Sequence, residues 1–301
     1  MFVKYLLPLA SIVAFNLGAP TMAAEPDWAK EVGKTIGKEG AMAEGGVYKI
    51  SLPRSDLNVT VDGTKISPAL SLGSWIAFQD QGDIAMVMGD LVLTQAELNT
   101  VMSRLTEGGI QITAIHHHLL RADPLPLYMH IEGTGEAVAM ARVIRSALER
   151  SKTPLKSAGT QQPGKLDLDT VALDEIIGQK GEASGGVYKF SIPPHQKITM
   201  DGLPIPESMG TATAIGFQPT GGGKAAINGD FVLTAAAVSP VVKTLRQNGI
   251  EVVAIHSHML DEQPRIFFMH FWANDDAQTL ARGLRAALDK VAGGEQSPTG
   301  H

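Results

Sequence analysis

The feature that most constrains this chain is an internal repeat that covers most of its length. The segment Gly45–Lys49 returns as Gly185–Lys189, and the Gly-Asp pair at 89–90 returns at 229–230. The segment between the copies, residues 151–165, has the proline and glycine content of a linker. The sequence therefore predicts two tandem copies of one domain, at residues 27–150 and 166–292, followed by a flexible tail at 293–301.

Each copy carries the same succession of secondary-structure signals. A short helix with Asp27 as its cap is followed by alternating strands, and Asp62-Gly63 marks a hairpin turn between residues 58 and 66. Thr94 and Glu97 form a capping box, which predicts a helix that begins there and ends at the glycines near 109. A histidine-bearing strand, a second strand and a last helix complete the copy. We expect an α+β fold in which each copy is a mostly antiparallel sheet with two or three helices, close to a split β-α-β layout.

The first residues resemble a secretory signal. Residues 1–24 place a lysine, an apolar run and small residues in the order of a signal peptide, and the run is short for a membrane span. The formal net charge of −6 argues against a nucleic-acid partner, and the absence of cysteine excludes thiolate ligands and disulfides. We expect a periplasmic or secreted protein with no integral membrane span once the signal is removed.

Six of the nine histidines fall into two matching sets. Ala-Ile-His-x-His occurs at 114–118 and again at 254–258, and a further histidine follows each block at the same spacing. The sets are His116, His118 and His130 in the first copy, and His256, His258 and His270 in the second. This is the strongest chemical signal in the sequence, although structural histidines on a sheet face remain the alternative.

Strand geometry decides whether the three side chains of a set meet. Alternate residues of a strand share a face, so His116 and His118 point the same way and His117 points the other way. If even-numbered residues pair across the hairpin, for example His118 opposite His130, all three histidines lie on one face. A slip of one residue would place His130 on the far face.

Three imidazoles without thiolate suit a divalent transition metal, zinc foremost, with copper, nickel or iron as alternatives. Three protein ligands leave a coordination position open, which is typical of catalytic zinc. Glu132 has the same strand parity as His130 and is the candidate fourth ligand or catalytic base, but its counterpart is Trp272. Asp90 and Asp230 are candidate partners of the ligands, with a strand-end role as the alternative.

These residues give the chain a resemblance to the LppY/LpqO family of exported bacterial proteins, a domain of unknown function often found in tandem. The resemblance rests on residues 45–53 and 89–94 and, in both copies, on the Ala-Ile-His-x-His block with its following Met-His. Some family members are lipoproteins, and because this chain lacks the lipidated cysteine, the resemblance implies a soluble periplasmic form. It implies no particular activity.

Three functions remain open from the sequence. The first is a periplasmic metal-binding protein with duplicated His-x-His…His sites. The second is a metal-dependent hydrolase of an envelope substrate with Glu132 as base. The third is a metal-free binding or scaffold module that binds an unknown small molecule or envelope component.

Overall fold

The computed structural model describes residues 25–82, 84–156 and 166–294, so the expected signal peptide lies outside it, as do most of the linker and the last residues. The first copy contains α1 (Asp27–Ile36), β1 (Ala41–Ala43), β2 (Val47–Pro53), β3 (Thr60–Val61), β4 (Thr64–Lys65), α2 (Pro68–Ser71), β5 (Gly73–Asp80), β6 (Ala85–Leu93), α3 (Gln95–Glu107), β7 (Gln111–His116), β8 (Ala122–Asp123), β9 (Leu127–Gly135) and α4 (Ala137–Leu148). The second contains α5 (Thr170–Ile177), β10 (Glu182–Ser184), β11 (Val187–Ile192), β12 (Thr199–Met200), β13 (Leu203–Pro204), β14 (Thr213–Gly221), β15 (Lys224–Thr234), α6 (Ala235–Gln247), β16 (Glu251–His256), β17 (Ile266–Asp276) and α7 (Ala277–Gly294).

The two copies form equivalent six-stranded sheets in which neighbouring strands are antiparallel. Their orders are β1-β2-β5-β6-β9-β7 and β10-β11-β14-β15-β17-β16. The strand β9 lies between β6 and β7, which α3 connects, so the predicted split β-α-β arrangement is present in the first copy and repeated in the second. The α+β tandem fold predicted from the repeat is confirmed.

Local signals explain most element boundaries. The capping box of Thr94 and Glu97 begins α3, and the backbone of Asp62-Gly63 turns with positive φ between β3 and β4. One detail was wrong: α1 begins after Pro26, and Asp27 is its first residue rather than its cap. Proline is favoured at helix starts because its missing N–H has no partner there in any case.

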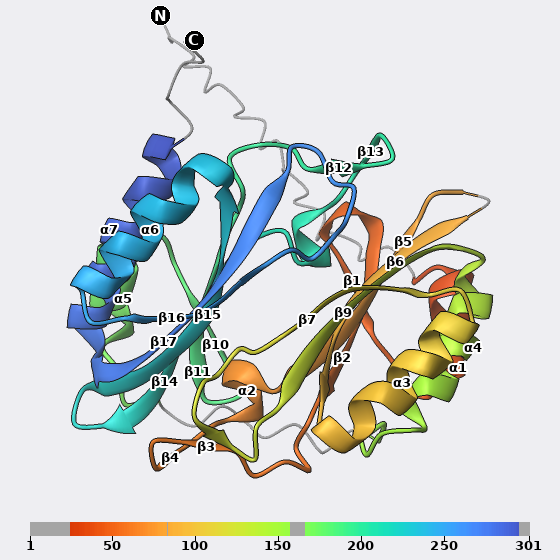
Figure 1. Ribbon diagram of the computed structural model, residues 1–301, viewed down its shortest axis with the longest axis horizontal. Helices are drawn as coiled ribbons and strands as arrows, with labels where there is room; N and C mark the ends of the chain where they lie inside the picture. The colour runs from red at the N-terminus through yellow and green to blue at the C-terminus, as the bar shows by residue number, and fades with distance from the viewer. Residues whose placement is uncertain (1–24, 83, 157–165, 295–301) are drawn as a thin grey trace, which may run out of the picture.

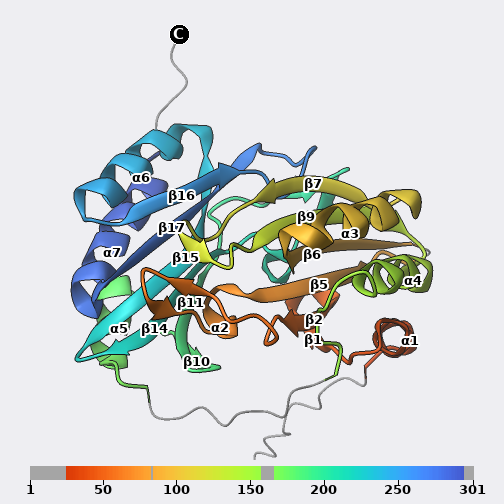
Figure 2. The same cartoon turned by 60° about the horizontal axis from the view of Figure 1, so that its bottom comes forward.

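The two domains meet through their sheets. Figure 1 shows α1, α3 and α4 covering the outer face of one sheet and α5, α6 and α7 covering the outer face of the other, so that the inner faces look at each other. The edge strands β7 and β16 come together along one side (Figure 2). The molecule is therefore a four-layer structure of helices, sheet, sheet and helices.

Each domain also inserts an arm into the layer between the sheets. Trp272 and Ala226 of the second domain pack with the β3–β4 hairpin and Leu72 of the first. On the other side, Met86 and Met88 of the first domain pack with Met200 from β12 of the second and with residues that follow it. Because both apolar clusters draw residues from both domains, neither domain buries its inner face alone.

The copies differ at one buried ion pair. Arg54 has no exposed surface, and it donates to Val92 O at 2.7 Å and to Glu97 Oε2 at 2.9 Å. The equivalent positions in the second copy are Pro194 and Ala237, which cannot form such a pair. Glu97 thus serves as both helix cap and counter-ion, and a catalytic role for it is unnecessary.

We expect Arg54→Met to lower the free energy of unfolding by ~3–5 kcal/mol, because Glu97 would remain buried without its partner. Urea unfolding followed by circular dichroism measures this change. Arg104→Met is the matched control: the Arg104–Glu107 pair is exposed, so its loss should cost ~0–1 kcal/mol. Equal effects of the two substitutions would contradict the buried role of Arg54.

Candidate metal centre

Each histidine set occupies the inner face of its own sheet. His116 and His256 end the edge strands β7 and β16, and His118 and His258 stand two residues beyond those strands. His130 and His270 lie in β9 and β17, next to the edge strands. All six histidines therefore lie along the line where the two edge strands approach each other.

The strand register meets the parity condition but differs in its detail. His130 lies opposite Ala114 and His116 lies opposite Tyr128, so even-numbered residues do face one another. His118 is not opposite His130, because the strand β7 ends at His116. A bulge between Ile112 and Ala114 sets this register.

The histidines of the two copies interleave. The ring centroids of His116 and His256 are 3.7 Å apart across the domain interface. His118 lies 3.7 Å from His270, and the equivalent pair of His258 and His130 is 3.8 Å apart. The sets expected to work separately, one per copy, thus form one cluster to which both domains contribute.

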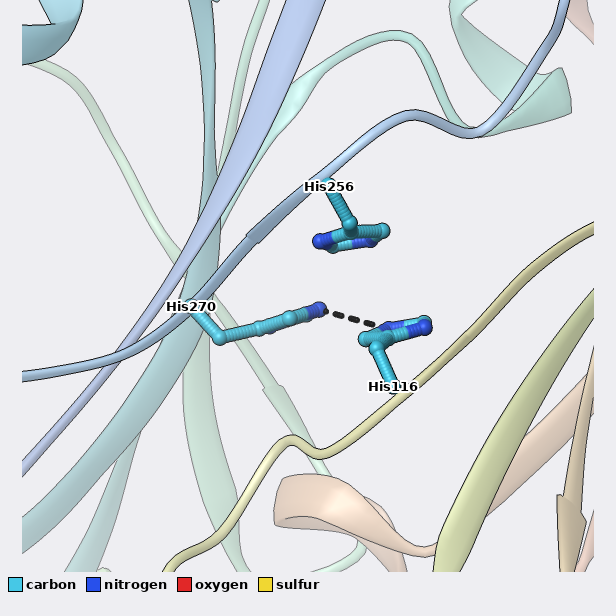
Figure 3. A group of neighbouring side chains, drawn as sticks. All are labelled: His116, His256 and His270. Atoms are coloured by element: carbon cyan, nitrogen blue, oxygen red, sulfur yellow. Dashed lines mark hydrogen bonds between the residues drawn. The ribbon is translucent and has the colours of Figure 1, made fainter.

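Two groups within this cluster could hold a metal ion. They are His116, His256 and His270, and His130, His256 and His258, and the ligand atoms in each group lie within 4.8 Å of one another. The Nε2 atom of His116 is 3.1 Å from that of His270, as Figure 3 shows, and 3.0 Å from that of His118. Two nitrogens that each lie ~2.0–2.1 Å from one zinc ion would be separated by ~3 Å, so these spacings suit shared coordination.

Backbone carbonyls orient two of the rings. The Nδ1 atom of His270 lies 2.8 Å from Gly229 O, and that of His258 lies 3.1 Å from Gly210 O. A ring that donates from Nδ1 to a carbonyl leaves a lone pair on Nε2, which is the arrangement of most metal-bound histidines. The repeated glycine before the aspartate is needed here, because a Cβ at Gly229 would clash with Ala214 O.

The loops that carry His118 and His258 are held by hydrogen bonds from the opposite domain. Thr113 Oγ1 donates to His258 O at 2.6 Å, and Asn228 Nδ2 donates to His118 O at 2.8 Å. The rings themselves stack on an aromatic side chain of their own copy, His118 on Tyr128 at 3.4 Å and His258 on Phe268 at 3.3 Å. The aromatic residue directly before each Met-His pair is a sequence signal for this arrangement that the motif analysis did not use.

Several ring nitrogens are buried without a hydrogen-bond partner among the described residues. They are His116 Nδ1, His130 Nε2, both nitrogens of His256, and His258 Nε2. Burial, reinforced by neighbouring imidazoles, lowers the pKa of five of the rings, so these rings are neutral near pH 7: His116, His118, His130, His256 and His270. A buried polar atom without a partner costs ~1–3 kcal/mol, and a cation among the lone pairs would satisfy several at once.

Two carboxylates flank the imidazoles. Asp90 lies opposite His130 on the neighbouring strand, and Asp230 lies opposite His270. Asp90 Oδ2 is 3.5 Å from His118 Nε2. Asp230 Oδ2 is 3.0 Å from His258 Nε2, but the two atoms are not aligned for a hydrogen bond. Burial, with the nearby Asp230 carboxyl, raises the pKa of Asp90 to about 8.

Glu132 shares the inner face with His130 but belongs to different surroundings. It lies opposite Met88 and Gln111, and among the described residues no hydrogen bond or ion pair joins it to the histidines. Burial, and the acidic groups of Asp261 and Glu262 behind it, raise its pKa to about 7. Its role as base or ligand stays a prediction.

The remaining histidines lie apart from the cluster. His117 turns away as its parity predicts, with Nδ1 3.4 Å from Pro126 O, and His195 is exposed. His301 lies outside the described residues.

The fold and the shared cluster define a class of protein, a tandem α+β chain with a histidine-rich centre between its halves. The family model described as DUF1529, Domain of Unknown Function (DUF1259), matches residues 30–150 and again residues 171–290. The chain therefore belongs to this family and carries two tandem copies of its domain.

Other comparisons add little. No curated protein matches the chain. Among solved structures, the trimeric bacterial microcompartment shell protein PduB is similar at 12% identity over 83% of this chain and 89% of that one, with a TM-score of 0.21. EtuB from Clostridium kluyveri is similar at 8% identity over 84% and 90%, also with a TM-score of 0.21. At these scores neither structure informs the site. Within the described residues, no helix is long and apolar enough to cross a membrane.

We expect the metal-free protein to lose stability as the pH falls below about 6.5. Unfolded histidines take up protons near that pH, whereas the five rings with lowered pKa do not, and each differential proton costs ~1.4 kcal/mol per pH unit. Asp90 and Glu132 oppose this trend, because a carboxyl with a raised folded pKa loses stability as the pH rises instead.

Urea unfolding at pH 5, 6.5 and 8 measures the balance, with the exposed His195→Gln variant as control. Stability should be highest near pH 6.5. An unchanged free energy of unfolding between pH 6.5 and pH 5 would show that water reaches the histidine rings.

Proposed function

We propose that this chain is an exported metal-binding protein whose histidine cluster holds a divalent transition metal between its two domains. The observation that supports this most is the convergence of six imidazoles from both copies. Five of their ring nitrogens are buried and have no hydrogen-bond partner among the residues that the structure describes. The assigned ligands are His116, His118, His130, His256, His258 and His270.

The energetics of the cluster favour a ligand-binding role over a packing role. Polar rings on a buried face normally satisfy each nitrogen with a backbone or side-chain partner, because desolvation is otherwise uncompensated. Here the carbonyls of Gly229 and Gly210 hold two rings, while neighbouring nitrogens such as those of His256 have no such partner. Rings that are neutral near pH 7 need not lose a proton before they coordinate an ion.

The donor set selects the class of metal. Imidazole nitrogens suit zinc, copper, nickel and iron, whereas calcium and magnesium prefer oxygen. We take zinc as the leading candidate because neutral histidines and carboxylates are its ordinary ligands where thiolates are absent.

We also propose the location and the finer family. The leading residues have the composition of a secretory signal, so the ion would be acquired in the periplasm or outside the cell. The repeated Ala-Ile-His-x-His and Met-His segments support membership of the LppY/LpqO type.

Elemental analysis of untagged protein purified from the periplasm tests metal binding. We expect bound zinc or another transition metal, and we expect added Zn²⁺ to raise the melting temperature of chelator-treated protein. His116→Ala should abolish most of that rise, because His116 contacts ligands of both copies.

His195→Ala, at an exposed position outside the cluster, is the control and should behave as wild type. Wild-type protein with no metal above background, and with a melting temperature indifferent to chelator and to Zn²⁺, would remove the proposal and favour a metal-free binding module.

A metal-dependent hydrolase acting on an envelope substrate is the second candidate, and the Glu132 carboxyl favours it. A pKa of about 7 is suited to a general base at neutral pH. If the chain hydrolyses a substrate, Glu132→Gln should lower kcat by ~10²–10⁴-fold without loss of bound metal. Retention of full turnover by this variant would remove Glu132 from the mechanism, and Glu175→Gln, at an exposed position, is the acidic control.

A further inference from the structure

We propose, as an extension of the metal-binding function above, that the centre holds two ions bridged by Asp90 and Asp230. One ion would be held by His116, His118 and His270, and the other by His256, His258 and His130. Each triad takes two ligands from one copy and one from the other, and the repeat relates each residue to its counterpart. The two aspartates are thereby assigned as metal ligands.

The orientation of the rings argues against a single shared ion. A metal bound to an imidazole nitrogen lies close to the plane of that ring, because the lone pair lies in the plane. His116 and His256 are stacked with centroids 3.7 Å apart and planes only 18° from parallel. The planes of the other two close pairs are less parallel, at 30° for His118 and His270 and 27° for His130 and His258. His116 and His256 are therefore assigned to different ions.

His116 and His270, both in the first triad, have a different relation. The planes of His116 and His270 differ by 10°, their centroids are 5.0 Å apart, and their Nε2 atoms approach to 3.1 Å. The two rings therefore lie edge to edge with their nitrogens directed at each other, as Figure 3 shows. His118 brings a third Nε2 to within 3.0 Å of that of His116. His116 Nε2 is thus within 3.1 Å of an Nε2 atom from each of the other two members of its triad.

The second triad is the counterpart on the other side of the stack. His130, His256 and His258 offer ligand atoms within 4.8 Å of one another. His256 has no hydrogen-bond partner at either nitrogen within the described residues, and His130 Nε2 and His258 Nε2 have none either. This triad repeats the first with residues exchanged between the copies.

Each aspartate lies between the two triads. Asp90 Oδ2 is 3.5 Å from His118 Nε2 of the first triad, and its strand partner is His130 of the second. Asp230 Oδ2 is 3.9 Å from His270 Nε2 of the first triad and 3.0 Å from His258 Nε2 of the second. A carboxylate with one oxygen toward each of two cations is the usual bridge in two-metal sites.

Charge and coordination number agree with this assignment. The Oδ1 atoms of Asp90 and Asp230 are buried and have no partner among the described residues, although two carboxylates near each other repel when both are charged. A pair of divalent ions would neutralise both. Three histidines and one oxygen from each bridging aspartate would give each ion five ligands, a coordination number that catalytic zinc can reach.

The first test counts ions. Chelator-treated wild-type protein is titrated with Zn²⁺, desalted and analysed for metal, and two ions per chain are expected. One ion per chain would overturn the two-ion centre and leave the metal-binding function standing. No bound ion would overturn both.

The second test asks whether the aspartates form the bridge. Protein loaded with Cu²⁺ is studied by electron paramagnetic resonance, where two carboxylate-bridged ions couple and give a signal weaker than their copper content. A signal that accounts for all the copper as isolated ions would overturn the bridge.

Substitution provides the third test. Asp90→Asn and Asp230→Asn should each weaken zinc binding by ~10–100-fold and reduce the coupling between the copper ions. Asp201→Asn, at an exposed turn, is the matched control. Unchanged stoichiometry and coupling in both aspartate variants would overturn the assignment, and if either variant fails to fold, the two wild-type measurements decide it.

Discussion

The whole molecule depends on two sheets that can bury their inner faces only against each other. Helices shield the outer faces, and the inner layer is filled by two apolar clusters that draw side chains from both domains. The histidine cluster lies within this same layer, so the contacts that hold the domains together also position the histidines. Thr113 and Asn228 illustrate this, since each binds the carbonyl of a histidine in the opposite domain.

Low solvent exposure gives the cluster its chemical character. His130 and His270 are each only 2% exposed. Water cannot easily satisfy such rings, and protonation is disfavoured because an imidazolium would be desolvated among other imidazoles. Ring stacking with Tyr128 and Phe268 adds rigidity at the two ends of the group. The result is a set of lone pairs held in place before any ligand arrives, which lowers the entropic cost of binding.

Much of the fold could be predicted from the sequence because its signals are local. The capping box at Thr94, the turn at Asp62-Gly63 and the repeat itself each act over few residues or by simple copying. Strand parity likewise placed His116 and His130 on one face. The contacts between histidines of different copies were not predictable. They depend on how the two sheets pack, and no pattern within one copy encodes that packing. The pairing of His118 with a ring of the other copy is a product of that packing.

The two copies differ in sequence at positions outside the six-histidine cluster and its two aspartates. Pro194 and Ala237 occupy the positions equivalent to Arg54 and Glu97. Glu132 is matched by Trp272, which packs against the first domain. Every member of the six-histidine cluster and both aspartates are the same in the two halves. That contrast has a consequence for any gene that encodes one half alone. Its product would complete the centre only when two molecules meet, so ion capture would vary with protein concentration. A fused chain is free of that dependence, and it can change one half without changing the other.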